Sequence, residues 1–167
     1  MAYALLILIM ALAIPHIPAQ GAAPLPTAAK EYLQGHNQAR AAVRVSPLKW
    51  SEGLANAASR VVRYQRNKMR CGLASLTNRN YGWNQLWTSG KTLTPRMVVD
   101  TWVKEKQYYN YANNMCLPNH TCRVYTQVVW RKSLELGCAQ ARCVKEGTSI
   151  TICFYNPPGN IVGKKPY

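Results

Sequence analysis

The sequence has no apolar stretch long enough to cross a membrane. Its N-terminal uncharged apolar run, residues 4–14, has eleven residues, whereas a spanning helix needs about 20. Pro15 follows, and small side chains then stand at Ala19, Gly21, Ala22 and Ala23, an order typical of a secretory signal peptide. We expect residues 1–21 to be a signal peptide, cleaved within 19–23, and the protein to be extracellular, in the apoplast or cell wall if the source is a plant. An uncleaved anchor is the alternative.

Acidic side chains are scarce, because 6 Asp and Glu stand against 21 Lys and Arg, for a net charge of +15. An extracellular protein seldom meets nucleic acid, so the partners expected for this charge are acidic cell-wall polysaccharide or anionic lipid headgroups. The alternative is a soluble surface without a specific partner. The densest basic cluster is predicted to lie on one helix, where a solvated face and a polyanion-binding surface both remain open: Arg60, Arg63, Arg66, Lys68 and Arg70.

Cysteine, by contrast, is plentiful after the expected signal peptide. The 6 cysteines stand at positions 71, 116, 122, 138, 143 and 153. An even number in an exported chain predicts three disulfides, although fifteen pairings remain open from the count alone. Asn119-His120-Thr121 is an N-glycosylation sequon, with Asn119 as the acceptor. A chain of 167 residues suits one domain.

Local patterns predict helices early in the chain and strands late. Residues 124–130 and 148–156 are rich in the β-branched and aromatic side chains of strands, and the apolar run that resumes over 134–143 after a polar turn predicts a further strand. Thr27 is expected to cap a helix that ends near Val43, Ser51 a second helix, and Thr94 a third with Pro95 at its first position. This order favours an α+β fold, a three-layer α-β-α sandwich with an antiparallel sheet covered on both faces.

Three short motifs carry a family resemblance: YTQVVWRKS at 125–133, HNQAR at 36–40 and SPLKW at 46–50. They resemble the CAP superfamily, the fold shared by plant pathogenesis-related protein 1, cysteine-rich secretory proteins and insect venom antigen 5. The resemblance covers residues 27–167 and is closest to pathogenesis-related protein 1 and its pistil-expressed branch. It implies a CAP domain over residues 27–156 with the same α-β-α sandwich. It also selects one set of disulfides: Cys71–Cys143, Cys116–Cys122 and Cys138–Cys153.

Many CAP proteins have two His and two Glu across a central cleft, able to hold a divalent metal such as zinc. In this sequence these four positions, called the tetrad positions below, are Ser75, Trp83, Glu105 and Val124. Only Glu105 matches the family, and the two histidines beyond the expected signal peptide, His36 and His120, fall elsewhere. Because zinc prefers nitrogen, sulfur or carboxylate ligands in a tetrahedral set, we expect no metal or other cofactor. Glu105 is expected to be held by hydrogen bonds or paired with a Lys or Arg, and His36 to be a satisfied core residue.

The residues at the tetrad positions point to binding rather than catalysis. Valine and tryptophan make the cleft apolar, and a hydrolase would need a histidine base that the resemblance does not place beside Ser75. The resemblance implies sterol or other apolar lipid binding, with core packing as the alternative for the candidate rings Trp102, Tyr108, Tyr109 and Tyr111. We expect a monomeric, non-enzymatic protein of plant defence or reproductive tissue.

The C-terminal segment, residues 153–167, resembles the motif from which pathogenesis-related protein 1 releases an eleven-residue defence peptide, except that Phe154 stands where Asn is usual. Residues 157–167, called the tail below, contain no cysteine. One cut between Asn156 and Pro157 would therefore free the tail for a receptor. The alternative is that the tail covers the sheet edge and stays attached.

Overall fold

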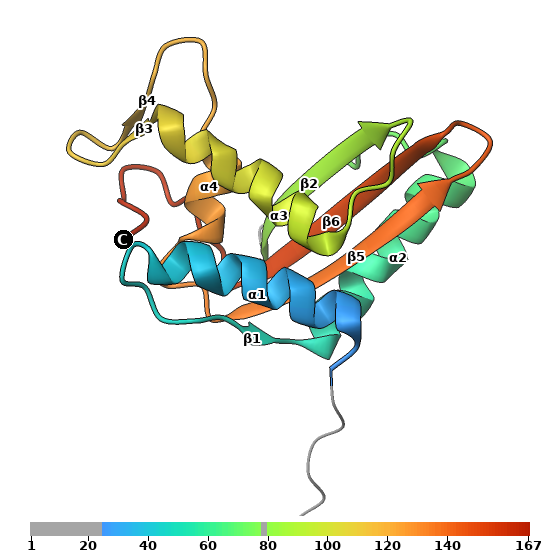
Figure 1. Ribbon diagram of the computed structural model, residues 1–167, viewed down its shortest axis with the longest axis horizontal. Helices are drawn as coiled ribbons and strands as arrows, with labels where there is room; N and C mark the ends of the chain where they lie inside the picture. Colours follow the sequence, from blue (N-terminus) through green and yellow to red (C-terminus); the bar gives the residue numbers. More distant parts are fainter. Residues whose placement is uncertain (1–24, 78–79) are drawn as a thin grey trace, which may run out of the picture.

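A four-stranded sheet divides the helices into two layers (Figure 1). The computed structural model describes residues 25–77 and 80–167, so the expected signal peptide, residues 1–21, lies outside the described residues. Within the described part, no helix is both long enough and apolar enough to span a bilayer. The elements in chain order are α1 (Thr27–Ala41), β1 (Lys49–Trp50), α2 (Glu52–Lys68), β2 (Gly82–Ser89), α3 (Pro95–Val103), the 3-10 helix η1 (Lys104–Tyr108), β3 (Tyr109–Asn110), β4 (Met115–Cys116), α4 (Arg123–Val128), β5 (Glu135–Cys143) and β6 (Thr148–Asn156).

The sheet has the strand order β1-β5-β6-β2, and β6 lies between two antiparallel neighbours while β1 joins β5 in parallel. Both faces of β6 are buried. Ile150 and Ile152 pack with the apolar side of α2, whereas Cys153 and Tyr155 pack with α1, α3 and α4 on the opposite face (Figure 1). The expected three-layer sandwich is therefore confirmed, and so are the predicted strands over 134–143 and 148–156.

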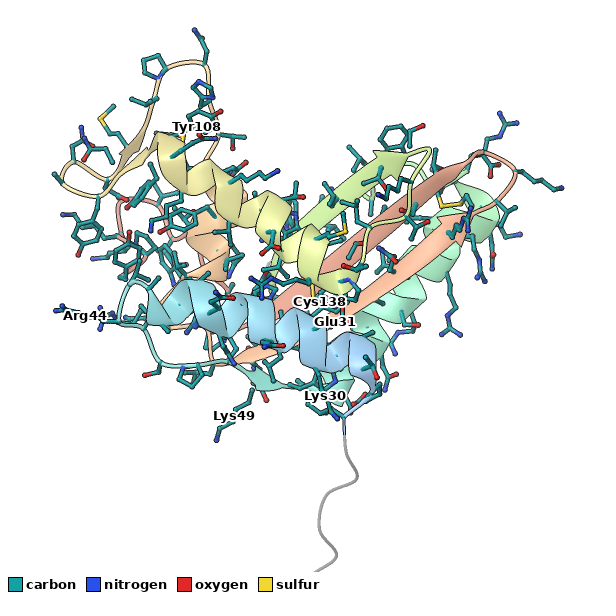
Figure 2. The ribbon with its side chains drawn as sticks, viewed as in Figure 1. Lys30, Glu31, Arg44, Lys49, Tyr108 and Cys138 are labelled. Atoms are coloured by element: carbon teal, nitrogen blue, oxygen red, sulfur yellow. A yellow bond between two sulfur atoms is a disulfide. The ribbon has the colours of Figure 1, made fainter. Side chains whose placement is uncertain are left out.

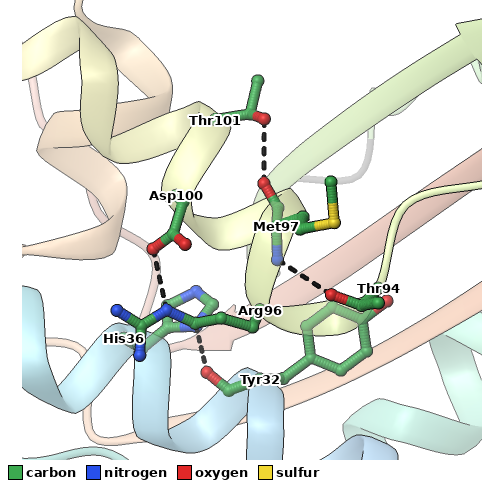
Figure 3. A network of polar contacts seen from close by, with 7 residues as sticks. All are labelled: Tyr32, His36, Thr94, Arg96, Met97, Asp100 and Thr101. Carbon is green, nitrogen blue, oxygen red and sulfur yellow. Dashed lines mark hydrogen bonds and ion pairs between the residues drawn. The ribbon is translucent and has the colours of Figure 1, made fainter.

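Two of the three predicted helix caps are confirmed. The Ser51 hydroxyl accepts from the Leu54 N–H at 3.5 Å at the start of α2, and the Thr94 hydroxyl accepts from the Met97 N–H at 3.3 Å at the start of α3 (Figure 3). The cap predicted at Thr27 is wrong. Pro26 holds the cap position because its carbonyl already accepts from Lys30 N–H at 3.0 Å, and α1 ends at Ala41 rather than near Val43.

The strand predicted over residues 124–130 is also wrong, because this stretch forms the short helix α4. Its Val, Tyr and Thr residues favour a strand only as a context-dependent preference. Groups from other elements bind both ends of α4 in the helical form. Glu105 accepts hydrogen bonds from the Val124 and Tyr125 N–H groups, and Arg40 donates to the Val128 carbonyl at 3.2 Å.

All three disulfides implied by the resemblance are present. Cys71–Cys143 ties the end of α2 to the end of β5 across 72 residues. Cys138–Cys153 joins directly paired residues of β5 and β6, and Cys116–Cys122 closes the loop that follows the β3–β4 hairpin.

Near the start of β5, a Cβ on Gly137 would overlap the backbone of Leu54 and Ala55, so glycine lets α2 lie directly against the sheet.

Candidate functional site

Hydrogen bonds from two β2 side chains to the backbone place three of the tetrad positions, Ser75, Trp83 and Val124, near the start of β2. The Asn84 amide donates to the Val124 carbonyl at 2.9 Å, which places Trp83 next to the start of α4. The Gln85 side chain bonds both backbone groups of Ala74, at 3.0 and 3.2 Å, and so holds the neighbouring Ser75 beside β2. Neither of the two cavities described below is lined by any of the four residues at the tetrad positions.

Glu105 is held by hydrogen bonds, which decides between the two roles left open by the sequence. Its Oε2 accepts from the N–H groups of Val124 at 3.1 Å and Tyr125 at 3.2 Å. Burial raises the pKa of this carboxyl, and the two N–H donors lower it in part. The group therefore caps the first turn of α4, where its charge also complements the helix dipole.

These residues do not fit a divalent metal. A tryptophan indole is only a donor and valine has no ligand atom, and the single carboxylate already binds the α4 backbone. Across residues 25–77 and 80–167 there is no group of three or more His, Cys, Asp or Glu side chains that could hold a metal ion. We derive no reaction through a metal.

His36 is a fully buried core residue with both ring nitrogens engaged, as the sequence predicts. Nδ1 donates to the Tyr32 carbonyl at 2.7 Å (Figure 3), and Nε2 therefore accepts from the Tyr155 hydroxyl at 2.8 Å. The Asn84 amide donates in turn to the Tyr155 oxygen at 3.1 Å. Burial lowers the pKa of His36 to about 4, so the neutral ring is the stable form at neutral pH.

Two of the four lipid-binding candidates face the interior. Trp102 is only 2% exposed, and its ring meets His36 edge-on with centroids 6.1 Å apart. Tyr109 is half-buried and donates its hydroxyl hydrogen to Asn114 Oδ1 at 2.8 Å. These two rings therefore serve the packing of the α1–α3–α4 layer.

The other two candidates are already stacked on partners. Tyr108, labelled in Figure 2, stacks on His120 with ring centroids 3.6 Å apart. His120 lies in the short loop closed by the Cys116–Cys122 disulfide. Tyr111 stacks on Tyr167 of the tail with centroids 4.7 Å apart, and Lys165 Nζ lies 4.4 Å from the same ring. The four candidate rings do not converge on one open site.

Two cavities differ in what they could bind. One of about 210 Å³ lies between the tail and the β3–β4 region, and its lining includes Arg123, Lys164 and several amide and hydroxyl groups. The other, about 400 Å³, lies between the N-terminal ends of α1 and α3 and the sheet. Its lining is mostly apolar: Pro26, Ala28, Ala29, Tyr32, Trp50, Glu52, Pro95, Cys138, Ala139 and Gln140.

The tail is docked mainly on α4, and its Gly159 backbone also lies against Gly82 at the start of the edge strand β2. The Asn160 side chain accepts from the Thr126 hydroxyl at 2.6 Å and donates to the Arg123 carbonyl at 2.9 Å. Gly159 N–H donates to Gln127 Oε1 at 3.1 Å, in a contact so close that a Cβ on Gly159 would meet the Gln127 amide.

The end of the tail is held as well. The Arg131 N–H donates to the Pro166 carbonyl at 2.7 Å, and the Asn114 amide donates to the Lys164 carbonyl at 3.2 Å. Together with the Tyr111–Tyr167 stack, these contacts fasten the tail to the β3–β4 hairpin and to the segment that follows α4.

The expected cut site lies in a hydrogen-bonded segment. The Asn156 side chain donates to Glu135 at 2.8 Å and its carbonyl accepts from Leu134 N–H at 2.8 Å. The Pro157 carbonyl accepts from the Ser133 hydroxyl at 2.8 Å. The sequon residue Asn119, by contrast, is exposed in its loop.

The sequence did not reveal the apolar cavity, the docking of the tail or the role of Arg40. Arg40 is fully buried, and its guanidinium donates only to backbone carbonyls, those of Ser46, Val128, Trp130 and Ser133. Its place in the motif at 36–40 was visible, but the carbonyls it binds lie as far as 93 residues away.

A family profile described as "CAP: Cysteine-rich secretory protein family" matches residues 33–155. The STS14 protein of Solanum tuberosum is 57% identical over 140 residues, which are 84% of this chain and 65% of that protein, so the chain spans just under two thirds of that relative's length. Pathogenesis-related protein 1C of Nicotiana tabacum is 43% identical over 142 residues, 83% of this chain and 80% of that protein. Neither of these two names specifies an enzymatic reaction.

A solved structure shares the fold. Venom allergen-like protein 4 of Schistosoma mansoni superimposes with a TM-score of 0.67 at 24% identity, over 86% of this chain and 95% of that one. At this identity the likeness concerns the fold alone. The sequence relatives and the family profile go further, and the chain belongs to the CAP, or cysteine-rich secretory protein, family as a homologue of the plant pathogenesis-related proteins of type 1.

Proposed function

We propose that this chain is a secreted, non-enzymatic protein of plant defence or reproductive tissue that binds part of a sterol or another apolar lipid. The observation that carries the proposal is the apolar cavity of about 400 Å³ between the N-terminal ends of α1 and α3 and the sheet. Its volume lies within the range of about 300–1,000 Å³ typical of small-molecule sites. At the lower end of that range, it suits a ring system or a segment of an acyl chain.

The lining of the cavity favours an apolar ligand. Alanine and proline side chains and the Trp50 ring supply apolar surface. Two of the polar lining residues already have partners: the Trp50 indole N–H donates to Glu52 at 2.9 Å, and the Gln140 amide donates to the Leu93 carbonyl and the Thr151 hydroxyl at 3.2 and 2.8 Å. The buried Tyr32 hydroxyl in the same lining has no hydrogen-bond partner. A ligand without strong donors would therefore leave no new polar group unsatisfied.

A cavity-filling variant tests this site. Ala28 lines the cavity from the exposed side of α1, so Ala28→Trp can occupy it without disturbing the core. Ala41→Trp, at the other exposed end of α1, is the matched control. With a fluorescent sterol and a fluorescent fatty acid as probes, we expect saturable binding to the wild type, about tenfold weaker binding to Ala28→Trp, and no change in the control. Native mass spectrometry of the secreted protein should detect a co-purified lipid. Absence of binding to both probes would refute the proposal.

A second candidate function is the precursor of a signalling peptide. It is supported by the attachment of the tail, because beyond Asn156 only non-covalent contacts hold residues 157–167 to the domain. The hydrogen bonds around Asn156 and Pro157 mean that a protease must first open the end of β6. The test is a search for free peptide beginning at Pro157 in extracellular fluid after wounding. Recovery of intact chain alone, with no response to synthetic peptide, would exclude this function.

A further inference from the structure

One end of the molecule gathers basic side chains from two elements far apart in sequence. The end of α2 supplies Arg66, Lys68 and Arg70, and the β5–β6 hairpin supplies Arg142 and Lys145, all of them exposed. The Cys71–Cys143 disulfide joins these segments, with Cα atoms 6.0 Å apart. Side chains ending in nitrogen project from this end in Figure 2. The sequence shows the α2 cluster, but only the fold adds the residues of the hairpin.

Two of the 6 acidic side chains lie at the opposite ends of the same elements. The two elements α2 and β5 run in the same direction, since Gly137 contacts Leu54 at their starts while Cys143 bonds Cys71 at their ends. Glu52 and Glu135 begin them, and Glu146 is the one carboxylate in the hairpin turn. Among the residues described, the single ion pair is Arg96–Asp100, on α3, so the basic end carries no ion pair of its own.

Apolar side chains are exposed within the same basic end. Met69 is 50% exposed, Leu73 63% and Val144 77%. Each lies within two residues of Cys71 or Cys143, so the disulfide brings the three together. Single exposed apolar residues are common, but several gathered inside a cationic rim indicate a surface that meets another phase or partner.

We propose that this basic end, made of the C-terminal end of α2, residues 69–73 and the β5–β6 turn, docks on an anionic lipid bilayer. Its lysines and arginines would contact headgroup phosphates, while Met69, Leu73 and Val144 enter the interfacial region. A soluble acidic polysaccharide offers the same charge complementarity, but it gives the apolar side chains nothing to enter. The docking surface is separate from the apolar cavity, which lies on the other face of the sheet, so either proposal can fail without the other.

Vesicle flotation tests the docking. We expect protein purified from the culture medium, with its N-terminus checked by mass spectrometry, to float with phosphatidylcholine vesicles that contain phosphatidylserine and not with phosphatidylcholine alone. Binding should weaken as salt rises. Arg66→Glu with Arg70→Glu should reduce the partition coefficient about thirtyfold or more, because each basic residue near the surface contributes about fivefold. The matched control is Arg44→Glu with Lys49→Glu, two exposed residues on other elements (Figure 2).

A second pair of variants separates the bilayer from a soluble polymer. Leu73→Ala with Val144→Ala should reduce vesicle binding about tenfold, whereas Ile161→Ala with Val162→Ala, exposed residues of the tail, should not. The proposal is overturned if anionic vesicles are not bound, or if the basic-end and control variants lose binding equally. It is also overturned if the Leu73 and Val144 variants bind normally while polygalacturonate displaces the protein completely, because the surface would then be a polysaccharide site.

Discussion

The two faces of the sheet are stabilised in different ways. On the α2 face, Leu54, Ala58 and Val62 pack on β5 and β6, and a disulfide fastens the end of the helix. On the other face, α4 is held by polar groups that come from elsewhere in the chain, chiefly Arg40 and Glu105. The first face agrees with its local sequence, whereas the second is specified by hydrogen bonds between distant residues.

Helix α4 is the clearest example of an element that is specified by distant residues. It has only 6 residues, several of them with strand preference, and a helix so short is not stable alone. Glu105 occupies its positive end and Arg40 its negative end, an arrangement that the helix dipole favours. Asn160 of the tail then bonds its side. The secondary structure of this stretch is a consequence of tertiary contacts.

The largest expected effect on stability comes from removing the disulfide of the α2 face, Cys71–Cys143. Replacing Cys71 and Cys143 by serine opens a loop of 72 residues, and the free energy of unfolding should fall by about 4 kcal/mol in the chain-entropy description. Denaturant titration measures this loss. The same replacement at Cys116 and Cys122, which close a loop of 6 residues, should cost only about 2 kcal/mol. Equal losses would mean that loop length does not govern stability here.

Removing Arg40 should have the next largest effect, now on the α4 face. Arg40→Met leaves the carbonyls of Ser46, Val128, Trp130 and Ser133 without this donor, and we expect a loss of about 3 kcal/mol. Burial lowers the pKa of Arg40 to about 10, so the side chain is still charged at neutral pH. The exposed Arg44→Met is the control, with a change below about 0.5 kcal/mol. A small loss for Arg40→Met would show that packing alone holds α4.

Sequence patterns predicted the parts of the fold in which local signals and packing agree. The caps at Ser51 and Thr94 and the strands β5 and β6 depend on residues close in sequence. The residues at the tetrad positions follow from the sequence motifs alone, and their role stays a prediction. Helix α4 could not be predicted in this way, because Glu105, which binds its first turn, lies 19 residues before Val124. The apolar cavity depends on how the ends of α1 and α3 approach the sheet, which no local pattern encodes.

The lowered pKa of the buried His36, on the α1–α3–α4 face, should make the free energy of unfolding fall in acid. Its pKa of about 4 lies below the ordinary value of 6.5, so between these values the unfolded chain binds a proton that the folded chain does not. Stability therefore falls as pH falls below 6.5, by about 2 kcal/mol at pH 5. The difference between the stability–pH profiles of the wild type and His36→Gln should show this slope. Parallel profiles for wild type and His36→Gln would contradict the assignment.

The smallest expected effect separates the charge of Glu105 from its role as an acceptor. Glu105→Ala loses both bonds to α4 and should cost about 1 kcal/mol. Glu105→Gln keeps an acceptor oxygen without the buried charge, so at neutral pH it should be at least as stable as the wild type. Because the carboxyl pKa is raised, its stabilising contribution declines as pH rises through the folded-state value, and the advantage of Gln should grow with pH. Equal destabilisation by Ala and Gln would show that the charge itself is required.

Hydrogen exchange of the α4 amides tests most directly whether this helix is stabilised by contacts with residues of other segments. Asn160→Gly removes the side-chain amide that bonds Thr126 and Arg123. The backbone of Asn160 has a positive φ of 56°, which glycine adopts readily. Val162→Ala, also in the tail, is the control. We predict that Asn160→Gly speeds exchange in α4 by about tenfold or more and leaves α2, β5 and β6 unchanged. Equal acceleration in all elements, or none in α4, would contradict the account.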